Sequence, residues 1–255
     1  MQIALPGELA RPYKNPAQQA RVVSEAWGEG NLYCSSCTSP HLRRLPTNTP
    51  ALDFECPKCD SLYQLKSQRH RFTSRINDAA YDKMRAAIME RRTPNILALH
   101  YDADIWTVQN LFLVPSFAFS LSCLEKRKAL RSSAERAGWV GCNILLVNIP
   151  PDARIPIVVE GQPAHPSHVR QQYERLRPLQ EMKVEARGWT LDMLNVVRGI
   201  GRREFSLAEV YACEEALQRL HPQNLHVRDK IRQQLQFLRK LGWIKFMGRG
   251  NYRLT

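Results

Sequence analysis

Four cysteines in two closely spaced pairs constrain the fold of this chain more than any other feature. Cys34 and Cys37 form one Cys-x-x-Cys turn, Cys56 and Cys59 form a second, and eighteen residues separate the two turns. This spacing is typical of a zinc site, because each turn can direct two thiolates at one tetrahedral Zn²⁺. Four protein ligands leave no open coordination position. The sequence therefore predicts that both turns meet around one structural zinc ion.

A second pattern interleaves with the cysteines. Asp53 precedes the second cysteine turn and Gln64-Leu65-Lys66 follows it, with apolar residues around the polar ones. Gln64 and Lys66 lie two residues apart and share one face of an expected strand. The Asp53 carboxylate, the Gln64 amide oxygen and the Leu65 backbone carbonyl are ligands that suit a hard cation such as Mg²⁺. Lys66 can orient or deprotonate an attacking water and offset negative charge, so the pattern suits phosphodiester hydrolysis.

The charge of the chain predicts a polyanionic partner. The formal net charge is +13 at pH 7, and the last segment is the most one-sided. From His221 to Thr255 there are eight Lys and Arg residues against Asp229 alone, a net charge of +7 in 35 residues. Such density favours nucleic acid over a merely solvated face. We therefore expect DNA as the partner.

The sequence offers no sign of export or of a membrane anchor. The residues from Met1 to Asn15 lack an apolar signal core, and no stretch of eighteen uncharged apolar residues exists. Beyond the two paired turns, the cysteines are scattered singly at Cys123, Cys142 and Cys213. This usage fits an intracellular zinc protein with free thiols. We expect a cytoplasmic protein with no membrane partner and no small-molecule organic cofactor.

The order of expected elements in the first part of the chain predicts an α/β domain over residues 1–180. Apolar spacing indicates helices over residues 17–29 and from Asn77 to Arg91. Apolar runs predict strands over residues 96–101, 106–114, 144–147 and 155–159. The segment from Pro163 to Pro178, rich in Pro, Arg, Gln and His, has the composition of a linker.

The capping and apolar patterns of residues 187–255 predict a second domain of three helices and a hairpin. Thr190 is expected to cap a helix that runs to Ile200, and Ser206-Leu-Ala-Glu209 is a capping box that opens a helix to about Leu220. Asn224 can cap a third helix that buries Val227, Ile231, Leu235 and Leu238 and ends at Gly242. Residues 243–247 and 252–254 then pair across a Gly-Arg-Gly-Asn turn. Three helices followed by such a hairpin make a winged helix.

Over nearly its whole length, the chain resembles the DpnI-type methyl-directed restriction endonucleases of the PD-(D/E)xK superfamily. Besides the cysteine turns, the strings that carry the resemblance are Asp53-Phe54, Leu65-Lys66-Ser67, Ile76-Asn77-Asp78, Arg136-Ala-Gly-Trp139, Gly141-Cys-Asn-Ile144, Arg187-Gly-Trp-Thr190, Lys230-Ile-Arg-Gln-Gln-Leu-Gln236 and Gly248-Arg-Gly250. The resemblance implies a mixed sheet flanked by helices with a Cys₄ zinc knuckle, followed by a winged helix. It also implies Mg²⁺-dependent cutting of double-stranded DNA at G-A-T-C sites whose adenines carry N6-methyl groups.

The chain departs from the family pattern at one catalytic position. The family places Glu where this chain has Gln64, and an amide brings no charge with which to hold Mg²⁺. Glu55, two residues after Asp53, is one candidate for the missing charge, although an exposed residue beside the knuckle is the better expectation. Glu25, on the first helix, is another candidate but is expected to face solvent.

The resemblance also implies which residues read DNA. A tryptophan in the string that holds Trp139 contacts the methyl groups of the methylated site in this family, and an indole face suits such contacts. On the third helix of the winged helix, Arg232, Gln233 and Gln236 lie opposite the buried face, where Arg can bond guanine and Gln adenine. Arg249, at the tip of the hairpin, is expected to hold a phosphate.

These patterns favour a methyl-directed type II restriction endonuclease and leave two alternatives open. One is a reader of methylated DNA that has lost catalysis through Gln64. The other is a zinc-containing winged-helix transcription regulator, in which Asp53 and Lys66 would be idle. Only the endonuclease predicts Mg²⁺-dependent strand breaks.

Overall fold

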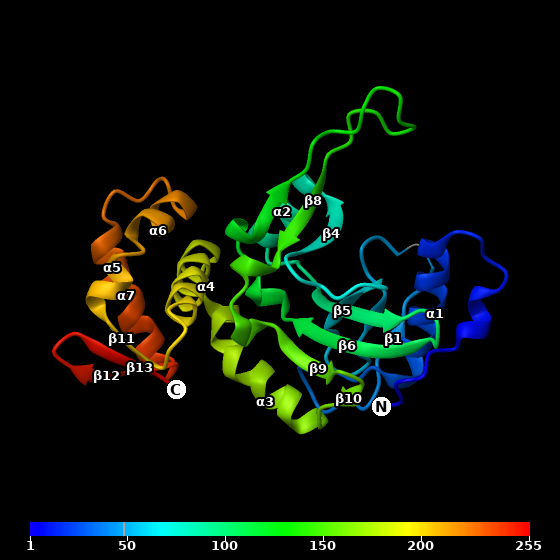
Figure 1. Ribbon diagram of the computed structural model, residues 1–255, viewed down its shortest axis with the longest axis horizontal. Coiled ribbons are helices and arrows are strands. Elements are labelled where there is room, and N and C mark those ends of the chain that lie inside the picture. Colours follow the sequence, from blue (N-terminus) through cyan, green and yellow to red (C-terminus); the bar gives the residue numbers. More distant parts are fainter. Residues whose placement is uncertain (48) are drawn as a thin grey trace.

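The structure is a computed structural model that describes residues 1–47 and 49–255. It has two lobes side by side along the longest axis, with the N-terminus on the larger lobe and the C-terminus on the smaller (Figure 1). No helix in the described ranges is long and apolar enough to cross a membrane.

A seven-stranded mixed sheet forms the centre of the larger lobe. Its strand order is β1-β2-β3-β5-β6-β9-β10, and only β3 and β5 run parallel. The strands are β1 (Arg43–Arg44), β2 (Phe54–Glu55), β3 (Leu62–Gln68), β5 (Asn95–Asp102), β6 (Thr107–Val114), β9 (Ile155–Val159) and β10 (Gln162–Pro163). The central strand β5 is buried over five successive residues because helices and loops cover both of its faces. This mixed α/β sheet confirms the predicted fold class.

A smaller sheet stands beside the first. It has the order β4-β8-β7, from β4 (Arg75–Ala80), β8 (Gly141–Leu145) and β7 (Leu124–Lys126). Between β7 and β8 the chain leaves the lobe as a long loop over residues 127–140, which projects at the top of Figure 1. The helix predicted from Asn77 is wrong at its start, since Asn77–Ala80 pairs with β8 and only α2 (Tyr81–Met89) is helical. The strand predicted over residues 144–147 likewise ends at Leu145 and continues as a 3₁₀ turn.

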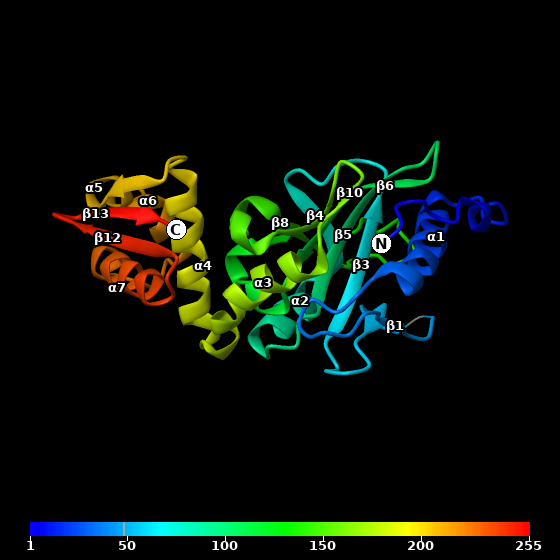
Figure 2. The same ribbon diagram turned by 90° about the horizontal axis from the view of Figure 1, so that it is seen from below.

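Helices brace the main sheet. Helix α1 (Pro16–Asn31) begins at Asn15, whose side chain accepts a hydrogen bond from the Ala17 amide, and it packs against β3. Helix α3 (Pro166–Leu176) occupies the segment predicted to be a linker, and that prediction is wrong. Its Val169, Tyr173 and Leu176 are buried, because this amphipathic stretch covers β9. In both views α3 lies between α4 and the main sheet (Figure 1 and Figure 2).

The smaller lobe is a winged helix. Its elements are α4 (Val184–Gly199), β11 (Glu204–Ser206), α5 (Leu207–Tyr211), α6 (Glu214–Leu220), α7 (Val227–Lys240), β12 (Ile244–Gly248) and β13 (Asn251–Leu254). The capping box at Ser206 is present, with both reciprocal hydrogen bonds, and α7 buries the four predicted apolar residues. The hairpin pairs β12 with β13, with positive φ at Gly248, Arg249 and Gly250 in its turn.

Three details of the winged helix differ from the sequence prediction. Helix α4 starts six residues before Thr190, whose buried hydroxyl donates to the Ala186 carbonyl within the helix. The second predicted helix is two short helices, because the backbone leaves helical geometry at Cys213 (φ −92°, ψ 7°). The N-cap position of helix α7 is His226, whose side chain makes no capping hydrogen bond, while the Asn224 side chain accepts a hydrogen bond from the His226 amide.

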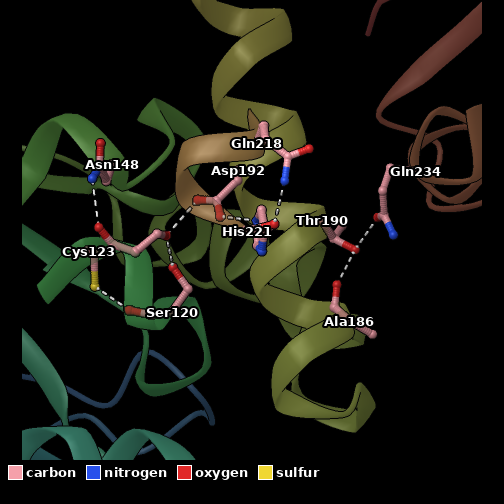
Figure 3. Close-up of polar contacts among 10 residues, drawn as sticks. Ser120, Cys123, Asn148, Ala186, Thr190, Asp192, Gln218, His221 and Gln234 are labelled. Carbon is pink, nitrogen blue, oxygen red and sulfur yellow. Dashed lines mark hydrogen bonds and ion pairs between the residues drawn. The ribbon is translucent and has the colours of Figure 1, made fainter. Parts of the chain in front are cut away.

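Buried polar contacts join the two lobes. The Asp192 carboxylate on α4 accepts a hydrogen bond from the Ser122 hydroxyl of the larger lobe (2.7 Å) and lies 2.8 Å from the His221 ring nitrogen (Figure 3). Its side chain is only 1% exposed. Arg198 forms an ion pair with Asp152 across the same boundary. The winged helix is therefore docked on the larger lobe through side chains of α4.

Candidate active site and zinc centre

The four paired cysteines meet in one place. Their sulfur atoms all lie within 4.8 Å of one another, with 3.6 Å between Cys34 and Cys59 and 3.5 Å between Cys37 and Cys56. Four thiolates about 2.3 Å from a tetrahedral Zn²⁺ would stand about 3.8 Å apart, so the cluster fits the ion. It supports the predicted structural zinc site.

The environment of the thiols suits metal binding as well. Burial raises the pKa of Cys56, but hydrogen bonds from the Lys58 and Cys59 amides and from the neighbouring thiols of Cys37 and Cys59 together lower it more, so that the pKa falls to about 7. Burial raises the pKa of Cys34 above its ordinary value. A bound cation would offset the cost of ionising that thiol, because metal ligation favours the thiolate.

Helix α3 and the 3₁₀ turn that follows it (Arg177–Glu181) hold the cysteine knuckle onto the lobe. The Arg170 guanidinium donates to the backbone carbonyls of Cys34 and Ser39, and the Arg177 guanidinium donates to that of Ser36. The knuckle is thus fixed both by its own cysteines and by a helix that is distant in sequence. The sequence does not predict this second support, because the composition of the segment is typical of a linker.

Asp53 contacts Leu65 just beyond the last paired residues of β2 and β3, Phe54 and Tyr63. The Leu65 amide donates to the Asp53 carboxylate at 2.7 Å. Because the N–H and C=O of one strand residue point to the same side, the Leu65 carbonyl also faces the edge that β2 has left open. Burial raises the pKa of Asp53, the Leu65 amide lowers it and the charge of Glu25 raises it again, with a net rise. This corner offers oxygen ligands and a carboxylate that a cation would help to ionise.

Gln64 and Lys66 lie on one face of β3, as predicted. Gln64 lines a cleft of about 560 Å³ together with Asp78 on β4, and the Lys66 ammonium lies 2.5 Å from the Asp78 carboxylate. Three basic side chains that the sequence reasoning passed over, Lys83, Arg91 and Arg92, line the same cleft. Such positive charge suits a groove that receives a phosphate backbone.

Glu55 and Glu25, the two candidates for the missing negative charge at the metal site, are each held in an ion pair. Glu55 is paired with Arg43 on the neighbouring strand, so its charge is already balanced. Glu25 is only 8% exposed and pairs with Arg44, so the expectation that it faces solvent is wrong. After burial and the Leu65 hydrogen bond, the charge of Glu25 is the next cause that acts on the pKa of Asp53, and it raises that pKa.

Trp139 is half-buried at the base of the loop over residues 127–140. The Arg136 guanidinium lies over its ring, 4.8 Å from the centroid. Gly141 begins β8 directly below, and a Cβ atom on that residue would come within 2.7 Å of the indole. The loop thus presents an aromatic ring and several cations in one place, as a DNA-facing surface would require.

The exposed face of α7 carries the predicted reading residues. Arg232, Gln233 and Gln236 are all exposed, and Arg232 donates to the Tyr211 hydroxyl. Arg249 is exposed at the tip of the hairpin. Arg253, on strand β13 of the same hairpin, is paired with Glu204.

Comparison with known families agrees with this architecture. A model described as DpnI, the Dam-replacing family, matches residues 1–182, and a model of the Dam-replacing HTH domain matches residues 185–254. The chain belongs to the DpnI family. As a DpnI-type protein it is a nuclease of the restriction-endonuclease class with a DNA-binding helix-turn-helix domain, so double-stranded DNA is its partner.

Proposed function

We propose that this DpnI-type protein is a Mg²⁺-dependent type II restriction endonuclease that cuts double-stranded DNA at G-A-T-C sites carrying N6-methyladenine. The observation that carries the proposal is the corner between β2 and β3, where Asp53 contacts Leu65 beside the cleft that Gln64 lines. Family membership supports a nuclease, and the cleft is where a phosphodiester would meet oxygen ligands and an ammonium group.

The proposed chemistry assigns a role to each residue of this corner. Asp53, the Gln64 side-chain oxygen and the Leu65 carbonyl would hold Mg²⁺, which supplies an activated water and charge stabilisation at phosphorus when bound. Lys66 orients the water and offsets the negative charge that develops on the phosphate oxygens. The zinc centre has no open coordination position, so its role is to fix β2 and β3.

Recognition is assigned to two surfaces. Trp139 offers an apolar ring to methyl groups in the major groove, and the cations around it hold phosphates. On the winged helix, Arg232, Gln233 and Gln236 provide base contacts, while Arg249 provides a phosphate contact. N6-methyladenine keeps one N6 hydrogen, so a glutamine contact survives methylation.

One observation favours a second candidate function. Gln64 brings no charge to the proposed metal site, which is expected of a methylated-DNA reader that no longer cuts. The two functions differ in a plasmid assay that uses matched DNA from adenine-methylating and non-methylating hosts, with Mg²⁺ or with EDTA. The endonuclease cuts only the methylated plasmid with Mg²⁺; a reader binds that plasmid and leaves it intact.

The same assay tests the assignment of Asp53. Asp53→Ala is expected to lower the cleavage rate at least about 1,000-fold, equivalent to about 4 kcal/mol of transition-state stabilisation, while affinity for methylated DNA changes little. The matched control is Asp82→Ala, which removes an exposed carboxylate on α2. Normal cleavage by Asp53→Ala would place the metal site elsewhere.

A further inference from the structure

Lys66 has a partner outside the Asp53…Gln64-Leu65-Lys66 pattern. The carboxylate of Asp78, on β4, lies 2.5 Å from the Lys66 ammonium. The Asp78 side chain is 3% exposed and that of Lys66 is 20% exposed. This is therefore a largely buried ion pair at the wall of the cleft that Gln64 and Asp78 line together.

Asp78 is held in place by the smaller sheet. It lies opposite Cys142 on β8, and the β4–β8 register shifts immediately after it, between Asp78 and Ala80. The Tyr81 amide then donates to the Val140 carbonyl, which ties the end of β4 to the base of the Trp139 loop. After burial, the charge of Asp78 is the second cause that raises the pKa of Cys142 to about 11, consistent with a carboxylate close to that thiol. The position of the carboxylate thus depends on β8 and not on the strand that carries Lys66.

The stability of the lobe does not by itself explain why this ion pair is buried. Removing two charges from water costs as much as their attraction returns, and apolar residues of similar volume often stabilise a core equally well. A long lysine side chain loses considerable rotamer freedom when it is fixed, and here it is fixed with its ammonium at the cleft. The pair therefore accounts for the orientation of Lys66 better than for the stability of the lobe.

We propose that Asp78 is a positioning residue that holds the ammonium of Lys66 at the cleft for phosphodiester cleavage. The inference rests on the proposed nuclease function. Among the described residues, the side chain that the Asp78 carboxylate contacts by a polar interaction is Lys66, so its role is exerted through Lys66. Without it, Lys66 samples other rotamers, and the charge that should meet the phosphate is misplaced.

The first test compares single-turnover cleavage by Asp78→Asn, Asp78→Glu and the wild type, with DNA affinity measured separately in EDTA. Asp78→Asn is expected to lower the cleavage rate about 10- to 100-fold, because a misplacement near 1 Å can have an effect of that size. Affinity should stay within about twofold, since phosphate and base contacts elsewhere carry binding. Asp78→Glu, which keeps the charge, should recover part of the rate.

The control Asp82→Asn removes a nearby carboxylate that is exposed on α2, and it should cut at the wild-type rate. Wild-type cleavage by Asp78→Asn would overturn the inference. A wild-type protein that does not cut methylated DNA at all would instead overturn the proposed function, so the two failures are distinguishable.

The second test separates positioning from a merely structural role. In a Lys66→Met background, Asp78→Asn should cause no further loss of rate, because the two residues act as one unit. In thermal unfolding, Lys66→Met should lower the midpoint by leaving a buried carboxylate unpaired, and adding Asp78→Asn should restore part of it. Equal losses of rate from Asp78→Asn in both backgrounds would show a structural effect and overturn the proposal.

Discussion

At the scale of single residues, the site depends on close contacts that leave little space for change. A hydrogen bond of 2.7 Å joins the Leu65 amide to the Asp53 carboxylate, and an ion pair of 2.5 Å joins Lys66 to Asp78. The proposed reading residue Trp139 is equally confined, between the Arg136 guanidinium and Gly141. Small substitutions next to these groups should therefore alter function before they alter the fold.

Gly141→Ala is expected to weaken the preference for methylated DNA. The added Cβ would come within 2.7 Å of the Trp139 indole, so the ring must move, whereas the β8 backbone can stay. Competitive cleavage of methylated and unmethylated duplexes should show a smaller ratio, in the same direction as Trp139→Ala. Gly199→Ala, with nothing within 4 Å of the new atom, is the matched control. An unchanged ratio in both Gly141→Ala and Trp139→Ala would place methyl recognition elsewhere.

At the scale of elements, the zinc knuckle determines where β2 and β3 lie. Cys56 directly follows β2, and two residues separate Cys59 from the start of β3 at Leu62. The knuckle therefore closes the connection between the strand end that carries Asp53 and the strand that carries Lys66.

Cys56→Ser is expected to reduce both zinc content and stability. Wild-type protein should contain one equivalent of zinc by atomic emission, and the variant should lose most of it, because serine is a poor zinc ligand. The midpoint of thermal unfolding should fall with it, since metal binding contributes to folding free energy. Cys213→Ser, which removes a cysteine distant from the cluster, should retain the zinc. A stable, active and zinc-free wild type would refute the assignment.

Helix α7 and the hairpin should divide the work of DNA binding. Gln233→Ala and Gln236→Ala are expected to weaken binding to the preferred site by roughly 1–3 kcal/mol, with little effect on scrambled duplex. Arg249→Ala should weaken all duplexes alike and reduce the salt dependence, because a phosphate contact carries no sequence information. Fluorescence anisotropy at several salt concentrations measures both effects. Equal losses on all duplexes for the glutamine variants would make α7 an electrostatic anchor.

At the scale of the whole molecule, the two lobes are docked through buried polar groups. Asp192 contacts both Ser122 of the larger lobe and His221 of the winged helix, and Trp189 stacks on the His221 ring at 3.8 Å. A buried carboxylate held from both sides makes the boundary specific, because any other arrangement would leave it without partners.

Ser122→Ala should loosen this boundary. Removing the donor leaves part of a buried carboxylate unsatisfied, which is expected to lower the free energy of unfolding by about 1–3 kcal/mol. Calorimetry should then show the lobes unfolding more independently than in the wild type. Ser132→Ala, on the exposed loop, should change the free energy of unfolding by no more than about 0.5 kcal/mol. A Ser122→Ala profile identical to wild type would mean that the contact does not couple the lobes.

The sequence by itself determined the features that depend on local spacing and residue chemistry. It predicted the meeting of Cys34, Cys37, Cys56 and Cys59 in one cluster, the capping box at Ser206, the buried face of α7 and the hairpin around Gly250. Each is specified by residues close in sequence, because thiolate spacing, helix caps, helical periodicity and turn residues act over a few positions. The family resemblance was visible for the same reason, as it is carried by short strings.

Only the tertiary structure decided the features that depend on what packs against a segment. Residues 166–176 form a helix because β9 and the zinc knuckle offer it a surface, although their composition resembled a linker. Asn77–Ala80 is a strand because β8 pairs with it, Glu25 is buried because Arg44 on β1 reaches it, and Asp78 meets Lys66 across two sheets. Asp78 lies 12 positions from Lys66, Arg44 lies 19 from Glu25 and Asn143 lies 66 from Asn77, and no local pattern encodes which of them the fold brings together.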